Sequence, residues 1–195
     1  MRIILASSSP RRKNLLKEEK IDFEVIPSNF DEESIKQIED NPGKLVEILS
    51  KGKGEEVLSR INKKEDFVII SSDTMVYLKG ELLGKPKDEK EAFEMIKSLQ
   101  NNMHTVYTGM YVIIKKENKI VKILTHSKSD VYFKKLTNEE ILEYVKKENT
   151  LDKAGAYAIQ EKAKEFVTKI EGRRSTVIGL DIEKLKEIFE KYEVM

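Results

Sequence analysis

The sequence predicts an α/β or α+β fold in which helices cover a mixed β-sheet. The apolar run at residues 67–70 indicates a central strand, and residues 75–78 extend it to a turn at 79–80. A short strand at 81–83 would then pair antiparallel with it. Segments with apolar residues at helical spacing, such as 87–100, separate the strands and imply crossover connections. Hairpins and crossovers together indicate a mixed sheet.

The other elements follow from short apolar runs and from capping signals. Residues 3–5 are typical of a short buried strand. Ser9 before Pro10 predicts a helix over 11–20 that begins with a serine side-chain cap. The same signals predict helices at 43–60, at 137–147 and after Asp181, and strands at 23–26, 106–115, 120–132, 166–170 and 176–178.

Length and charge limit the classes of protein that fit. The 195 residues suffice for one domain, predicted over residues 1–195, or for two small lobes that fold as one unit. Because 36 Lys and Arg balance 35 Asp and Glu, the net charge is only +1. That balance indicates a well-solvated surface, and we expect neither nucleic acid nor a membrane as partner.

The missing residue types exclude several kinds of site. Without cysteine the chain has no thiol chemistry and no zinc–thiolate site. His104 and His126 are the only histidines, so any metal must be bound by carboxylates. No apolar run approaches the length of a membrane span, and the first apolar run is too short for a signal peptide. We therefore expect a cytoplasmic protein.

The segment from Ser7 to Arg12 is a candidate anion site. Three serines precede a predicted helix, whose first backbone N–H groups can bind phosphate. Arg11 and Arg12 in the first turn oppose the helix dipole unless a bound anion reverses the effect. The alternative is an ordinary helix cap followed by arginines that face solvent.

Asp73 is the best candidate for chemistry. It lies in the run from Ser71 to Thr74, at the predicted end of a buried strand, where α/β proteins often place catalytic groups. An ionised carboxylate can accept a proton from water or hold a divalent cation. The alternative is a turn aspartate that bonds its own backbone. Lys85, beyond the hairpin, would supply a second cation for phosphate, or else be a solvated turn lysine.

A stretch of small residues at 152–160 is the last candidate. Small side chains allow a ligand to approach the backbone, and Lys153 and Gln160 could contact its phosphate and base. The alternative is a tight loop packed for steric reasons. The chain contains no Walker A motif, dinucleotide-binding glycine motif, nucleophile elbow or zinc-protease motif, so a P-loop does not handle the phosphate.

Five blocks in this order resemble the Maf family of nucleoside triphosphate pyrophosphatases over nearly the whole chain. The resemblance implies an α/β fold of the Maf/ITPase-like kind, with a long mixed β-sheet flanked by helices and two lobes around a central cleft. It also implies a cytoplasmic, homodimeric enzyme that needs Mg²⁺ or Mn²⁺. The blocks are residues 5–12, 72–74, 84–86, 107–109 and 152–160.

The resemblance assigns roles residue by residue. Asp73 matches the family's proton acceptor, and Glu32 is a candidate to share the metal with it. The positions that match substrate-binding and specificity residues are Ser7, Arg11, Arg12, Lys53, Thr74, Lys85, Lys153 and Gln160. The chain departs from the family pattern at Ile48, Gly54, Thr176 and Asp181, where arginine, alanine, asparagine and proline are usual.

The resemblance predicts hydrolysis of dTTP and UTP to the monophosphate and pyrophosphate. The motif that ends at Gln160 favours this branch over the branch acting on 7-methyl-GTP, which remains an alternative. A nucleotide-binding regulator of cell division without turnover is a second alternative. Asp73 and Lys85 favour turnover, because a pure binder has little use for a water-activating carboxylate beside an anion site.

Overall fold

The computed structural model describes residues 1–32, 35, 39–117 and 119–194. The chain forms two compact units, each assembled from separate stretches. Unit 1 comprises Met1–Asp73, Thr108–Ser127 and Gly179–Met195, and unit 2 comprises Thr74–Tyr107 and Lys128–Ile178. Whether they fold as one domain over residues 1–195 stays a prediction.

The described residues form a seven-stranded mixed sheet, which confirms the predicted fold class. β1 pairs in parallel with β2 and β3, whereas β4 runs antiparallel to β3 and β7 antiparallel to β6. Along the main path the order is β2-β1-β3-β5-β6-β7. The strands are β1 (Arg2–Leu5), β2 (Glu24–Val25), β3 (Phe67–Leu78), β4 (Glu81–Leu83), β5 (Met103–Lys116), β6 (Lys119–Phe133) and β7 (Val167–Glu171).

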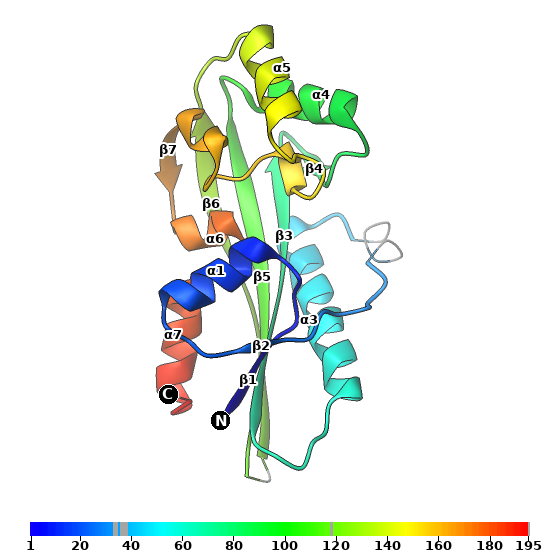
Figure 1. Ribbon diagram of the computed structural model, residues 1–195, viewed down its shortest axis with the longest axis vertical. Helices are drawn as coiled ribbons and strands as arrows, with labels where there is room; N and C mark the ends of the chain where they lie inside the picture. The colour runs from blue at the N-terminus through cyan, green and yellow to red at the C-terminus, as the bar shows by residue number, and fades with distance from the viewer. Residues whose placement is uncertain (33–34, 36–38, 118, 195) are drawn as a thin grey trace. The chain divides into compact units, whose positions relative to one another are not determined.

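Helices cover both faces of the sheet in unit 1. α3 (Pro42–Arg60) lies on one side, and α1 (Pro10–Glu18) and α7 (Ile182–Lys191) lie on the other (Figure 1). Successive side chains of a strand point to opposite faces, so β3 is buried along nearly its whole length. On the α3 side, Ile69 packs in a cluster with Val57 and Tyr111.

The helix starts in unit 1 follow the predicted signals with one exception. Asn41 accepts a hydrogen bond from the Lys44 N–H at 3.0 Å and so caps α3, as expected. Ser9 stands at the capping position of α1, but its side chain makes no capping hydrogen bond. The predicted serine cap is therefore wrong. Instead, the Ser9 N–H donates to Ser7 Oγ at 3.2 Å, which ties the segment before the helix to itself.

Unit 2 packs its helices around a continuous apolar core. Its helices are α4 (Glu89–Leu99), α5 (Asn138–Lys147) and α6 (Arg174–Ile178), with short 3₁₀ turns η1 (Ala154–Ala156) and η2 (Lys162–Glu165). The predicted capping box at Thr137 is present in both directions. The predicted strand at 176–178 is wrong, because these residues belong to α6. Gly179, with φ +121°, ends this helix and turns the chain towards α7.

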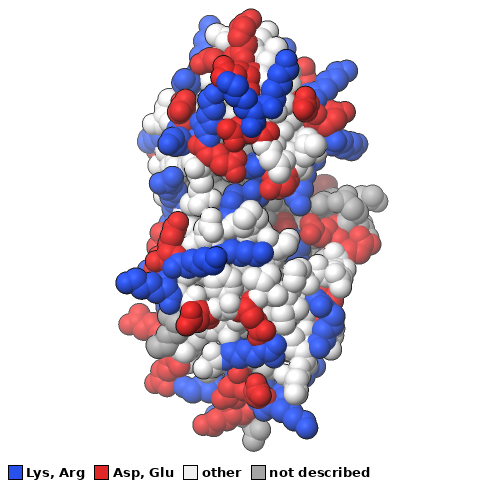
Figure 2. Space-filling view, in the orientation of Figure 1, with Lys and Arg blue, Asp and Glu red and all other residues white. Residues whose placement is uncertain are grey.

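Surface and helix properties complete the description of the fold. Within the described ranges, no helix is both long and apolar enough to cross a bilayer. Figure 2 shows basic and acidic side chains interspersed over one face, as the balanced composition suggests.

Two of the positions where the chain departs from the family pattern are buried, Thr176 in α6 and Asp181 at the start of α7. Asp181 caps α7 by accepting from the Lys184 N–H at 3.0 Å. Ile48, in contrast, is exposed.

Candidate active site

Asp73 lies inside a strand and not at its end. β3 continues for five residues beyond Asp73, so the predicted strand end is wrong. The strand stays extended because its far end pairs with β4, where Val76 lies opposite Leu83. The neighbouring strand β1 stops earlier, and its last paired residue, Leu5, lies opposite Ile70. The pairing of β1 with β3 therefore ends before Asp73, although β3 itself continues.

The alternation of a β-strand distributes the serines beside Asp73 over two faces. Ser71 and Asp73 face α3, and Ser71 Oγ donates to the Ser50 carbonyl at 2.7 Å. Ser72 faces the other side, where its hydroxyl lies 2.8 Å from the Gly179 carbonyl and 2.7 Å from that of Gly109. These serines fix β3 on both faces, so the position of the Asp73 carboxylate is well defined.

Two glycines let α3 approach the sheet closely enough to reach Asp73. A Cβ added to Gly109 would lie 2.1 Å from the Val46 carbonyl oxygen, inside the helix backbone. A Cβ added to Gly54 would lie 2.7 Å from Ser71 Oγ and also 2.7 Å from the Tyr111 ring. An alanine, which the resemblance gives as usual at this position, would therefore force its neighbours to shift.

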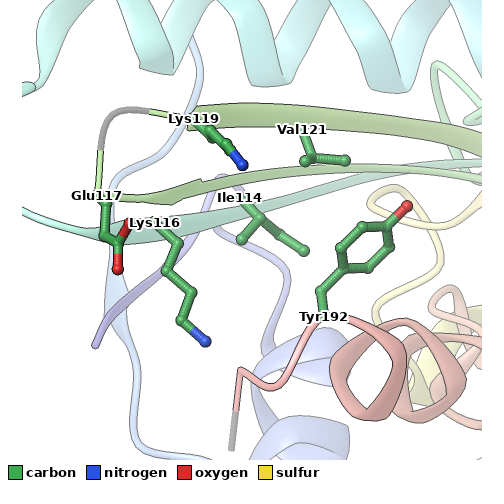
Figure 3. A pocket seen from close by; sticks show the side chains of 6 residues that line it. All are labelled: Ile114, Lys116, Glu117, Lys119, Val121 and Tyr192. Atoms are coloured by element: carbon green, nitrogen blue, oxygen red, sulfur yellow. The ribbon is translucent and has the colours of Figure 1, made fainter.

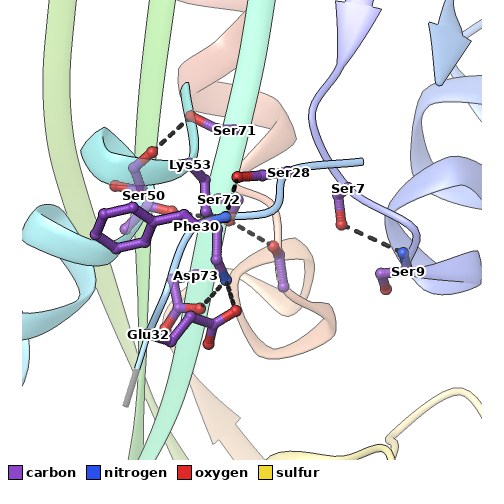
Figure 4. A network of polar contacts seen from close by, with 12 residues as sticks. Ser7, Ser9, Ser28, Phe30, Glu32, Ser50, Lys53, Ser71, Ser72 and Asp73 are labelled. Carbon is purple, nitrogen blue, oxygen red and sulfur yellow. Dashed lines mark hydrogen bonds and ion pairs between the residues drawn. The ribbon is translucent and has the colours of Figure 1, made fainter. Parts of the chain in front are cut away.

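Lys53 of α3 joins two carboxylates in what we call the carboxylate–lysine cluster. Its Nζ lies 2.5 Å from Asp73 Oδ1 and 2.9 Å from Glu32 Oε1 (Figure 4). The side chains of Lys53 and Asp73 are only 12% and 7% exposed. Among the described residues, the buried Asp73 Oδ2 has no hydrogen-bond partner. A buried carboxylate oxygen without a partner is costly unless a ligand satisfies it.

The cluster fits a divalent cation that is also held by phosphate. Asp73 and Glu32 offer the hard oxygen ligands that Mg²⁺ and Mn²⁺ prefer, and one of these oxygens is the unsatisfied Asp73 Oδ2. Within the described residues, no three or more acidic or histidine side chains gather to hold a metal by themselves. Mg²⁺ is usually bound through one or two carboxylates together with substrate phosphates, and these two residues match that pattern.

Arg12 is held in place close to the same cluster. Its Nε donates to the Gly179 carbonyl at 2.7 Å, and its Nη1 donates to Ser7 Oγ at 3.1 Å. Burial lowers the pKa of Arg12 and so disfavours its charge, while the nearby charges of Asp73 and Glu32 act in the opposite direction. The charge of Arg11 also lowers this pKa. A bound anion would therefore stabilise the positive charges of Arg11 and Arg12 together.

The predicted residues of unit 2 lie around the hairpin and the loop at 149–161. Lys85 is exposed, and no described carboxylate pairs with it. The Gly155 N–H donates to the Gly84 carbonyl at 3.0 Å. This hydrogen bond connects the loop to the segment that follows the β3–β4 hairpin. Thr74 is partly buried in β3, and Gln160 is half-buried near the end of the loop. Lys153, in contrast, is buried with its charge fully engaged.

The structure adds one residue that the sequence reasoning missed. The Gly179 carbonyl accepts from both Arg12 and Ser72, and so connects the start of α1 with β3. The signal was a glycine directly after an apolar turn, which is typical of a helix end.

A hollow lies where β5 connects to β6 (Figure 3), away from the predicted site residues. It is lined by Ile114, Lys116, Glu117, Lys119, Val121 and Tyr192.

Comparison with known proteins identifies the family. The family model described as Maf-like protein matches residues 2–192. A Caldicellulosiruptor saccharolyticus protein named dTTP/UTP pyrophosphatase is 43% identical, covering 100% of this chain and 97% of that protein. Proteins of the same name from Thermoanaerobacter sp. (strain X514) and Clostridium botulinum (strain Okra / Type B1) are each 44% identical, covering 98% and 95% of this chain and 96% and 94% of theirs. From a match of this extent it follows that the chain belongs to the Maf-like protein family.

Proposed function

We propose that this protein hydrolyses nucleoside triphosphates to the monophosphate and pyrophosphate, with dTTP and UTP as its preferred substrates. The observation that carries the proposal is the buried Asp73 Oδ2 beside Lys53, which has no hydrogen-bond partner in the part of the chain that the structure describes. Relatives that match almost the full chain are named dTTP/UTP pyrophosphatases, which supports the choice of substrate.

Asp73 acts as the general base in this proposal. Water attacks the α-phosphorus, its proton passes to the Asp73 carboxylate, and the bond from the α-phosphorus to the bridging oxygen breaks. Pyrophosphate leaves with the electron pair of that bond. Lys53 holds the other oxygen of Asp73 at 2.5 Å, so the carboxylate keeps one orientation during the proton transfer.

The cationic groups of unit 1 bind the phosphates. Arg12 is fixed by Gly179 and Ser7, and its planar guanidinium suits two phosphate oxygens at once. Arg11 adds a second positive charge at the start of α1. Donors that are already in position stabilise the charge that develops in the transition state without a cost of reorganisation.

Glu32 and Asp73 are the residues that would hold Mg²⁺ or Mn²⁺. The cation would offset negative charge on the triphosphate and on the leaving pyrophosphate. Lys53 already contacts both carboxylates, so the carboxylate oxygens of Glu32 and Asp73 are kept close together before any cation binds.

Gln160 is proposed to select the base. Its amide offers a donor and an acceptor, which complement the O4 and N3–H edge shared by thymine and uracil. Thr74 and Lys85 complete the set of substrate contacts that the family resemblance predicts, whereas the buried Lys153, which the resemblance also assigns to the substrate, is left out of it.

A homodimer in the cytoplasm, acting on small nucleotides and not on nucleic acid or membranes, completes the proposal. Nucleoside triphosphates are made and used in the cytoplasm, which supports that location. Light scattering coupled to size-exclusion chromatography measures the oligomeric state, and a mass near twice 22.6 kDa is expected for a dimer.

A nucleotide panel with Mg²⁺ tests the function. Pyrophosphate and phosphate are scored separately, with dTTP, UTP, CTP, ATP, GTP and 7-methyl-GTP as substrates. We expect pyrophosphate from dTTP and UTP, with kcat/KM at least tenfold above the purine nucleotides, because a mismatched base leaves buried polar groups unpaired at about 1–3 kcal/mol each. A preference for 7-methyl-GTP would place the chain in the other branch. Binding without turnover would favour the regulator.

A further inference from the structure

Lys153 is buried where a substrate-binding lysine should be accessible. Its side chain is only 3% exposed. The ammonium group contacts the Asn149 carbonyl, Asp152 Oδ1 at 2.8 Å and Glu161 Oε2 at 3.3 Å. Two of these contacts are hydrogen bonds, to the Asn149 carbonyl and Asp152 Oδ1, and the contact with Glu161 Oε2 is an ion pair without a hydrogen bond. We call Lys153 and these three partners the lysine clamp.

The lysine clamp closes a loop whose backbone needs outside support. Gly155 and Ala156 both adopt left-handed conformations, with φ of +66° and +62°. A side chain disfavours this conformation, so Ala156 is strained and persists only where its surroundings hold it. The Gly155 N–H is bonded to the Gly84 carbonyl, and a Cβ on Gly155 would lie 3.0 Å from Val76 Cγ2. The first half of the loop is therefore fixed by packing.

The second half of the loop depends on Lys153. Gln160 is half-buried, and the residue directly after it, Glu161, is the one that reaches back to Lys153. A hydrogen bond from the Glu161 N–H to the Ala158 carbonyl at 3.1 Å tightens the turn that carries Gln160. The ion pair thus connects the start of the loop to the turn that presents the Gln160 side chain.

We infer that Lys153 is a positioning residue that sets base selectivity by holding Gln160, and that it does not contact the substrate. This inference rests on the proposed function, which assigns the base edge to Gln160. It replaces the prediction that Lys153 binds the substrate directly, because the ammonium group is only 3% exposed and is already held by two hydrogen bonds and the ion pair with Glu161.

Lys153→Met tests the inference through the ratio of kcat/KM for UTP to that for CTP. These nucleotides differ only at the edge of the base that Gln160 is proposed to read. We expect the ratio to fall at least fivefold, while inhibition by inorganic tripolyphosphate stays within twofold of the wild type. Lys164→Met is the control, because it changes an exposed lysine in the η2 turn that follows this loop. It should leave both the UTP to CTP ratio and the inhibition by tripolyphosphate unaltered.

Glu161→Gln provides a second variant in case Lys153→Met does not fold. It removes the charge of a residue that is 34% exposed and keeps its shape. The UTP to CTP ratio should fall in the same direction, by a smaller factor. If the ratio holds in the folded variants while kcat/KM drops equally for both nucleotides and tripolyphosphate binds more weakly, Lys153 contacts phosphate and the inference is wrong.

Hydrogen exchange separates failure of this inference from failure of the proposed function. In the protein without nucleotide, Lys153→Met should accelerate amide exchange across residues 154–161 and leave unit 1 unchanged. Unaltered exchange in this segment would overturn the inference, whatever the enzyme's activity. A wild-type protein that releases pyrophosphate from neither UTP nor CTP would instead remove the proposed function, and the exchange result would still decide whether Lys153 holds the loop.

Discussion

Replacing Asp73 with asparagine separates the chemical role of this carboxylate from its structural one. Asparagine keeps the shape and an oxygen that can accept from Lys53, but it cannot take a proton from water. Loss of a general base typically lowers kcat by about 10² to 10⁴, so we expect at least a 100-fold loss, about 2.7 kcal/mol of transition-state stabilisation. Nucleotide affinity should change by less than about threefold.

The fold should tolerate Asp73→Asn. Stranding one charge of a buried ion pair costs about 3–5 kcal/mol. Lys53, however, keeps Glu32 as a partner at 2.9 Å, and the Asp73 Oδ2 that asparagine alters has no hydrogen bond among the described residues. We therefore expect the free energy of unfolding to fall by only about 1–2 kcal/mol.

Three measurements check this prediction. Pyrophosphate release from UTP gives kcat, calorimetry with an α,β-imido analogue gives affinity, and urea denaturation gives stability. Asp66→Asn serves as the matched control, because Asp66 precedes the same strand and asparagine can keep the hydrogen bond that Asp66 Oδ1 accepts from the Glu117 N–H at 2.7 Å. A kcat for Asp73→Asn within threefold of the control would remove Asp73 as the base.

Three further substitutions test other parts of the account. Arg12→Ala should destabilise the unliganded protein by about 2 kcal/mol in urea denaturation, because the hydrogen bond to Gly179 is lost; an unchanged or higher stability would show that this contact contributes nothing. Gly109→Ala should lower both melting temperature and kcat, since its Cβ would displace α3 and with it Lys53; a fully active, equally stable variant would contradict the close packing of α3. Burial lowers the pKa of His104 to about 4. Between pH 6.5 and pH 4 the unfolded chain therefore binds a proton that the folded chain excludes, and stability should fall by about 3 kcal/mol as the pH drops through this window. His104→Gln should remove that part of the dependence, and a variant with the same slope as the wild type would show that His104 is not its source.

Local signals in the sequence determine most of the fold. Pro42 after Asn41, the capping box at Thr137 and the turn at 79–80 each specify an element through contacts within a few residues, and all three are present. The predicted capping role of Ser9 failed, because its side chain makes no capping hydrogen bond. The serine hydroxyl that is engaged at this helix start is that of Ser7, which accepts from the Ser9 N–H and from the Arg12 guanidinium.

Long-range contacts decide the details that the sequence could not predict. Asp73 lies within a strand because β4 extends the pairing of β3, whereas the sequence predicted that a buried strand ends at residues 71–74. The burial of Lys153 depends on Glu161, eight residues later, folding back onto it. Residue types at the candidate site were therefore predictable, whereas their partners, and hence their individual roles, required the structure.

Hydrolysis of UTP in ¹⁸O-labelled water, followed by mass spectrometry of both products, tests the central claim most directly. Attack of water on the α-phosphorus predicts one ¹⁸O in UMP and none in pyrophosphate, at a rate that Asp73→Asn lowers at least 100-fold. Label in pyrophosphate, or release of UDP and phosphate, would contradict the claim and show that a different bond is broken.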